Sequence, residues 1–207
     1  MGITERKERE REEMRELILK AAQKLFLEHG YEKTSIRGIA EVIEYSPATI
    51  YLYYKDKNEL LLALHVVAFQ KMMQEFSEVA VVIDSFERLI ELGRQYIKFA
   101  IENPELYDLM FIMQAPIEAL ACKDEVWEDG MKSFDFLRII VAECKKNDYF
   151  REDLDVDTAC LTIWSYMHGL ITIYLKKRMD MFEDDRPMDR MQESFQLFVE
   201  MLKTSLK

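Results

Sequence analysis

The sequence predicts an all-α protein. Apolar residues recur at three- and four-residue steps along most of the chain, which is the spacing of one face of a helix. Period-2 alternation, which is typical of half-buried strands, does not run for any useful length. The 207 residues contain only six Gly and four Pro, so few turns are obligatory.

Composition and charge limit the classes of function. Apolar residues make up 49% of the chain and aromatic residues 12%, which indicates a globular protein. The formal net charge is −11, but residues 1–60 hold eleven Lys/Arg and twelve Asp/Glu and are nearly neutral. We therefore expect a polyanionic partner to dock on the first third of the chain.

Location is predicted from the cysteines and from the hydropathy. Cys122, Cys144 and Cys160 are too far apart for a CxxC pair, and three cysteines suit a reducing compartment. The first residues have no apolar signal region, and no run of 18 uncharged apolar residues occurs. We expect a cytoplasmic protein that does not span a membrane.

The first helix is predicted from one apolar stripe. Met14, Leu17, Ile18, Ala21 and Leu25 follow helical spacing, and the stripe stops near the His29-Gly30 pair. The charged stretch before it alternates in sign at near-helical spacing. We expect this stretch to extend the helix as a solvent-exposed, charged lead-in. The alternative is an N-terminal arm that binds DNA.

Two short helices follow within thirty residues. Thr34 or Ser35 can cap the first, over Ile36–Ile43, and Ser46 can cap the second, which has Pro47 in its first turn. Only two or three residues join them. This is the layout of a helix-turn-helix, whose second short helix enters the major groove of DNA.

The remaining chain is predicted to be helical. The breaks fall at Asn103-Pro104, Ala115-Pro116 and Arg186-Pro187. The expected helices are a long segment from Asn58, then Ser85–Ile101, Pro104–Met113, about Ile117–Lys146, about Val156–Met179, and Met188–Leu206.

Four tyrosines surround the second short helix. Tyr54 and Ile50 are four residues apart and are expected to point inward with Ile39 and Leu60. Tyr51 is expected to pack its ring and to offer its hydroxyl to a phosphate. The exposed face, or its edge, is expected to hold Pro47, Ala48, Thr49, Leu52 and Tyr53. The alternative is that the tyrosines only pack a small helical subdomain.

These residues resemble a family. The run from Thr34 to Leu60 looks like the DNA-binding signature of the TetR family of bacterial regulators, T-x-x-x-I-A-x-x-x-x-V-S-x-x-x-x-Y-x-Y-F-x-x-K-x-x-L. The matches include Thr34, Ile39, Ala40, Ser46, Ile50, Tyr51, Tyr53, Lys57 and Leu60. The chain departs from the family at Ile43-Glu44-Tyr45, where Ala-Gly-Val is usual, and at Pro47-Ala48, where Lys-Gly is common.

The resemblance implies a double-stranded DNA operator as partner. Phosphate contacts are implied for Thr34 or Ser35, Tyr51, Tyr53 and Lys57. Contacts with base edges are implied for Arg37, Pro47, Ala48 and Thr49. Ser46, the expected cap of the second short helix, is also counted among the DNA-binding residues. The domain division expected from this is residues 1–56 for DNA binding and 57–207 for regulation and dimerisation.

A shorter resemblance occurs later in the chain. Trp164, His168 and Gly169 look like the W-x-x-x-H-G motif of one group of TetR-type regulatory domains, and residues 103–111 are similar to a segment of the same group. A satisfied core histidine is the alternative for His168. Neither His29 nor His65 has a partner at helical spacing, so no metal site is predicted.

A homodimer is expected from the helix around this motif, which is apolar nearly all the way round and must be covered on two sides. The last helix is similar. The resemblance implies that two such helices from each chain form a four-helix interface. The interface residues we predict are Tyr166, Gly169, Ile173, Phe195, Phe198 and Leu202.

Between the two ends lie many aromatic and Met side chains. Most are core, but thirteen methionines make the interior deformable enough to admit an apolar or cationic effector. The pocket residues we predict are Tyr107, Met110, Trp127, Phe134, Trp164 and His168. No cofactor is expected, and the absence of catalytic motifs predicts a regulator, not an enzyme. A helical interaction module without DNA binding is the rival hypothesis.

Overall fold

The computed structural model describes residues 2–113, 124–182 and 186–205; at positions 3, 124–129 and 205 it describes the backbone alone. All regular elements within these ranges are helical, which confirms the all-α prediction. The chain divides into two compact units, Met1–Gln70 with Glu105–Asp129, and Lys71–Pro104 with Gly130–Lys207. We call them the first and the second unit and describe each by itself.

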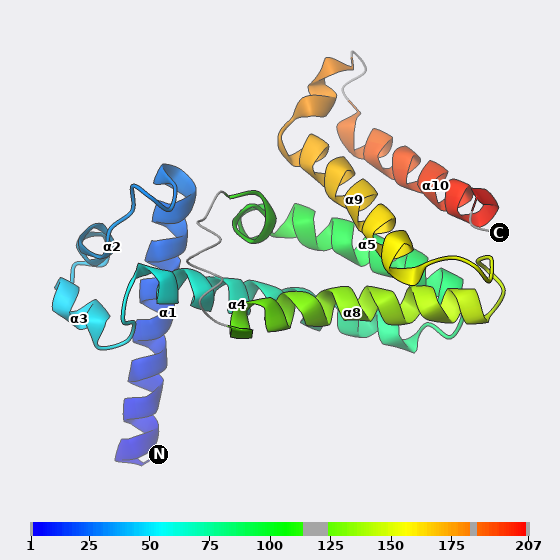
Figure 1. The fold of residues 1–207 in the computed structure, drawn as a ribbon. Helices are drawn as coiled ribbons and strands as arrows, with labels where there is room; N and C mark the ends of the chain where they lie inside the picture. The colour runs from blue at the N-terminus through cyan, green and yellow to red at the C-terminus, as the bar shows by residue number, and fades with distance from the viewer. Residues whose placement is uncertain (1, 114–123, 183–185, 206–207) are drawn as a thin grey trace. The chain divides into compact units, whose positions relative to one another are not determined.

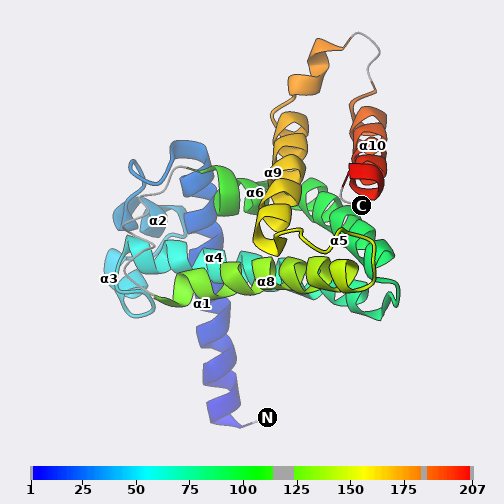
Figure 2. The same cartoon turned by 45° about the vertical axis from the view of Figure 1, so that its right-hand side comes forward.

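The N-terminal helices are α1 (Ile3–His29), α2 (Ile36–Val42), α3 (Pro47–Tyr51) and α4 (Lys57–Phe76). Figures 1 and 2 show α2 and α3 beside the C-terminal half of α1 in both views. The charged lead-in is a continuous part of α1, as predicted, and the helix ends at His29 before Gly30, whose φ of 81° suits only glycine.

Further along, a 3₁₀ turn (Ser77–Val81) leads to α5 (Ser85–Glu102) and α6 (Pro104–Tyr107). A π-helical turn, Asp108–Ile112, continues α6. The chain then forms α8 (Asp124–Lys146), α9 (Val156–Leu175), a 3₁₀ turn (Arg178–Met181) and α10 (Pro187–Ser205). The break at Ala115-Pro116 and the predicted helix start at Ile117 fall outside the described residues.

The core of the first unit joins α1 to the short helices. Ile18, Ala22, Ile39, Ile50 and Leu60 are fully buried in one apolar cluster. These residues come from α1, α2, α3 and α4, so the cluster fixes α2 and α3 on a platform of longer helices. Burial of each large apolar side chain contributes roughly 1.5–3 kcal/mol.

One histidine is buried in this unit without a hydrogen-bond partner for its ring nitrogen. His65 on α4 is 6% exposed, and its Nε2 atom has no hydrogen-bond partner among the residues that the structure describes. Desolvation lowers the pKa of His65 from 6.5 to about 4. The imidazole is therefore neutral at pH 7.

We expect this histidine to make the free energy of unfolding depend on pH. Between pH 6.5 and about 4 the unfolded chain binds the proton and the folded chain does not, so stability falls as the pH is lowered through that window. The upper limit is about 3 kcal/mol, because one pKa unit is about 1.4 kcal/mol. Urea titrations at several pH values should show a shallower loss for His65→Gln. His29→Gln, at an exposed site, is the control, and an equal effect of both substitutions would contradict the assignment.

In the second unit α9 packs against both α5 and α10. Figures 1 and 2 show α9 and α10 side by side. On α5, Gly93 allows close approach, because a Cβ atom there would lie 2.8 Å from the ring of Phe195 on α10. No helix in the described ranges is both long and apolar enough to cross a membrane.

Candidate nucleic-acid interface

Two serine caps define the short helices. The Oγ atom of Ser35 accepts a hydrogen bond from Gly38 N (3.1 Å), and that of Ser46 accepts one from Thr49 N (3.2 Å). Pro47 occupies the first turn of α3, where its missing N–H leaves no bond unmade. These caps confirm the predicted starts of α2 and α3. Four residues separate the helices, one more than the longest connection we predicted.

The turn between α2 and α3 contains a backbone conformation that favours glycine. Glu44 has a φ of 60°, and the next residue, Tyr45, donates its N–H to Ala40 O (3.0 Å). The left-handed region costs a residue with a Cβ atom roughly 1–2 kcal/mol. The chain has glutamate here, where glycine is usual in the family that the sequence resembles.

We expect Glu44→Gly to stabilise the protein by about 1 kcal/mol, because it removes this strain. For a chain of this length that raises the melting temperature by about 2–4 °C. Calorimetry would measure the change. Glu44→Ala keeps the Cβ atom and is expected to give no gain in stability. An equal gain from Glu44→Ala would show that the effect comes from removal of the carboxylate and not from relief of backbone strain.

The faces of α3 are largely as predicted. Ile50 is 0% exposed and Tyr54 is 3% exposed, and both belong to the cluster with Ile39 and Leu60. Tyr53 is half-buried. The interpretation of Tyr51 was wrong in one respect: its ring was expected to be packed, but 57% of the residue's surface is exposed. The reason is that α3 ends at Tyr51, so no further turn covers the ring.

Two of the residues predicted to contact phosphates already have partners. The hydroxyl of Thr34 is buried and donates to the carbonyl oxygens of Leu25 (3.0 Å) and Gly30 (2.9 Å). The ammonium of Lys57 donates to Tyr31 O (2.7 Å) and lies 4.1 Å from the centre of the Tyr31 ring. Both side chains tie the α1–α2 turn to its neighbours, and their phosphate contacts stay predictions.

The predicted base-reading arginine is also paired. Arg37 Nε lies 3.3 Å from Glu41 Oε1 one turn later on α2, and both side chains are mostly exposed. Exposed pairs at this spacing are worth about 0.3–0.5 kcal/mol, so Arg37 can leave Glu41 for another anion at little cost. The pair was not predicted, although the i, i+4 spacing was visible in the sequence.

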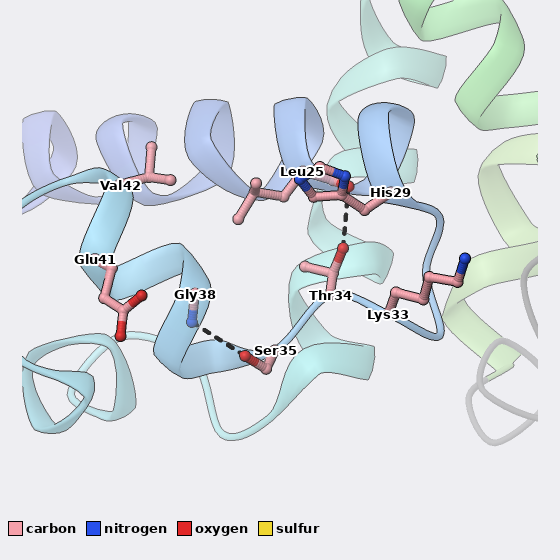
Figure 3. A pocket seen from close by; sticks show the side chains of 8 residues that line it. All are labelled: Leu25, His29, Lys33, Thr34, Ser35, Gly38, Glu41 and Val42. Carbon is pink, nitrogen blue, oxygen red and sulfur yellow. Dashed lines mark hydrogen bonds between the residues drawn. The ribbon is translucent and has the colours of Figure 1, made fainter.

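A groove of about 400 Å³ lies where α1 meets the start of α2. Figure 3 shows His29 and Lys33 near Thr34 and Ser35, with Glu41 on the other side of the group. Leu25, Gly38 and Val42 complete the lining. His29 and Lys33 were not predicted as site residues, although a basic residue directly before a capping Thr-Ser pair is a usable signal. The ammonium group of Lys33 and a ring N–H of His29 can donate hydrogen bonds to phosphate oxygens.

The predicted effector residues fall in different parts of the chain. Tyr107 and Met110 are buried in the first unit, where the Tyr107 ring lies 5.1 Å from Phe111. The side chain of Trp127 lies outside the described set. Phe134, Trp164 and His168 belong to the second unit and are half-buried.

In the second unit the ring of Trp164 contacts the other two rings. Trp164 lies 4.9 Å from His168 and 6.1 Å from Phe134, measured between ring centres. The Tyr96 hydroxyl and His168 Nδ1 are 3.1 Å apart and share a hydrogen bond. Burial lowers the pKa of His168 to about 4, so the ring is neutral at pH 7. The group of Tyr96, Phe134, Trp164 and His168 is here called the aromatic cluster.

The predicted dimer residues divide into two sets. Phe195, Phe198 and Leu202 are 7–9% exposed in the single chain, and Tyr166 stacks on Phe198 at 3.8 Å and donates to Ser194 O at 2.7 Å. Tyr166 and Phe198 therefore pack α9 against α10 within the protomer, and the Phe195 ring lies beside Gly93 on α5. Gly169 and Ile173 are exposed. On α9 and α10 the other exposed large apolar residues, which were not among the predicted interface residues, are Leu161, Leu197 and Met201.

The capped α2, the turn and the exposed α3 on a buried platform define a helix-turn-helix protein. Residues 18–64 match the model described as "Bacterial regulatory proteins, tetR family", and residues 89–202 match "Tetracyclin repressor-like, C-terminal domain". The chain belongs to the TetR family and is a transcriptional regulator, as the sequence resemblance indicated. The members of this family are regulators and not enzymes.

Named relatives cover most of the chain. The transcriptional repressor AcnR of Corynebacterium efficiens is 28% identical over 162 residues, which span 76% of this chain and 80% of AcnR. The probable acrEF/envCD operon repressor of Escherichia coli K12 is 24% identical over 172 residues, 78% of this chain and 76% of the relative. The fatty acid degradation regulator FadR from Bacillus halodurans shares the fold, with a TM-score of 0.73, 22% identity and coverage of 93% and 96%.

Proposed function

We propose that this regulator is a cytoplasmic, ligand-responsive repressor that binds a palindromic operator as a homodimer and is released by a small apolar or cationic effector. The observation that carries the proposal is the exposed face of α3, held by the Ser46 cap on one side and by buried Ile50 on the other. A helix presented in this way can enter a major groove without rearrangement of its supports. The repressor names of the two relatives support the direction of regulation.

The homodimer is supported by exposed apolar side chains on α9 and α10. Leu161 and Ile173 on α9 are 54% and 44% exposed, and Leu197 and Met201 on α10 are 58% and 52% exposed. The two helices pack on each other, so these side chains belong to one pair of neighbouring helices. Exposed apolar groups of this size favour a partner surface, and a second copy of the same pair gives a closed, two-fold interface.

The effector is assigned to the aromatic cluster. A neutral His168 beside Trp164 and Tyr96 presents ring faces and no net charge, which suits an apolar molecule or a cation held over a ring. An effector that releases the protein from DNA must bind the two conformations with unequal affinity.

We expect such a molecule to quench tryptophan fluorescence saturably and to weaken DNA binding over the same concentration range, because coupling between two sites is reciprocal. Trp164 contacts His168 and is the expected reporter, so Trp164→Phe should abolish the quenching while Trp127→Phe, the matched substitution, should keep it. A library of apolar and cationic compounds provides the probes. Responses to small organic anions alone would contradict the assignment.

Selection of random duplexes by the pure protein tests the DNA-binding proposal. The expected product is a palindrome whose half-sites are about 34–36 Å apart, or a multiple of that, bound by two or more chains. An interaction module without DNA binding is the competing function, and it would enrich no sequence.

A further inference from the structure

The exposed face of α3 is nearly without hydrogen-bonding groups. Four side chains project from it, and three of them, Pro47, Ala48 and Leu52, are hydrocarbon. Leu52 is 77% exposed, which is unusual for a leucine in a structured segment. Among these four side chains only Tyr51, 57% exposed, carries a polar atom, its terminal hydroxyl; the exposed capping residue Ser46 adds a hydroxyl at the edge of the face.

The polar side chains next to this face have partners within the protomer. Thr49 is half-buried, and its Oγ1 atom lies 3.0 Å from Ser46 Oγ, the atom that caps the helix. Arg37 on α2 pairs with Glu41. A helix of this composition offers base edges mainly methyl and methylene groups.

Only one feature of the major groove matches a hydrocarbon surface. Each base pair there presents donors and acceptors, and the thymine C5-methyl group is the single apolar group. A buried methyl–hydrocarbon contact is favourable by the hydrophobic effect, whereas a donor or acceptor covered by Ala48 or Leu52 loses its water without gaining a partner. The apolar face therefore selects thymine and disfavours guanine or cytosine at the positions that it covers.

We propose that α3 reads its half-site through thymine methyl groups, with Ala48 and Leu52 as the residues that contact them. This inference rests on the proposed DNA binding and names the chemistry by which the same surface recognises its partner. Tyr51 then positions the helix through its hydroxyl and adds no base preference of its own.

The test replaces thymine by deoxyuridine, which removes only the C5-methyl group. The duplex is the one selected by the pure protein. Each test duplex carries deoxyuridine at one thymine position of the half-site and at the equivalent position of the other half-site. Loss of one buried methyl is expected to weaken binding about fourfold per half-site, and so by more than tenfold for the symmetric duplex, at one or two positions. The other positions should change by less than twofold.

Two variants test which side chain contacts which thymine methyl group. Leu52→Ala should reduce the difference between the thymine and the deoxyuridine duplex at one position, and Ala48→Gly at another. Leu17→Ala is the matched control, because Leu17 is also an exposed leucine but lies on α1, and it should keep the full difference. At a sensitive position, 5-methylcytosine should bind better than cytosine.

The outcomes separate the two claims. Selected duplexes that bind equally well with deoxyuridine at every position would overturn the methyl readout and leave DNA binding intact. Failure to bind any duplex would overturn both.

Discussion

Gly169→Leu is expected to convert the protein from dimer to monomer at low micromolar concentration. A Cβ atom at Gly169 meets nothing within 4 Å in the described part of the protomer, so a side chain added there starts in open space. If α9 packs on its counterpart, the leucine forces the helices apart at a cost of about 1–3 kcal/mol. That weakens the dimer by roughly 5- to 150-fold.

The loss of operator affinity should be larger. Two linked recognition helices bind about 10²–10⁴ times more tightly than one, and this gain disappears with the dimer. Sedimentation and duplex titration measure the two effects. Ala142→Leu adds the same side chain at an exposed position of α8 and should leave both unchanged. A Gly169→Leu protein that stays dimeric would place the interface elsewhere.

Gly93→Ala is expected to destabilise the second unit although it adds one carbon atom. The new Cβ atom would lie 2.8 Å from two ring carbons of Phe195, a ring that is 9% exposed and cannot turn away freely. Overpacking of this kind costs about 1–3 kcal/mol, which lowers the melting temperature by about 2–12 °C for a chain of this length.

A second substitution separates the clash from other effects of Gly93→Ala. Phe195→Leu shortens the side chain that the methyl meets, so the double variant should lose less stability than the two single variants together. Gly38→Ala, where the nearest atom is 3.4 Å away, is the control with ordinary contacts. Additive losses in the double variant would show that Gly93 and Phe195 do not compete for space.

The local features of the first unit were predictable from sequence. Ser35 and Ser46 cap the helices they precede, and Ile50 and Tyr54 point inward, because caps and helical faces depend on residues within one or two turns. The exposure of Tyr51 was not predicted, because it depends on the helix ending at that residue, and boundaries are set by packing further away.

Contacts between residues far apart in the sequence were the main feature that could not be predicted. Lys57 matches the family signature at a position implied to touch phosphate, but its ammonium reaches a carbonyl 26 residues earlier in the chain, at Tyr31. In α10 nearly every apolar residue suited an interface, and the sequence could not tell buried Phe198 from exposed Leu197. A helix that is apolar on several sides has no pattern that separates its two faces.

Duplex affinity measured over a series of salt concentrations tests the central claim, that α3 and its platform bind DNA. A protein that displaces counterions from several phosphates shows a steep, linear fall of log K with log salt, at about 0.9 per phosphate contact. Tyr51→Phe should weaken binding to the selected duplex and to its single-base variants by the same factor, since its hydroxyl contacts the backbone. A flat salt dependence, with no effect of Tyr51→Phe, would contradict the account.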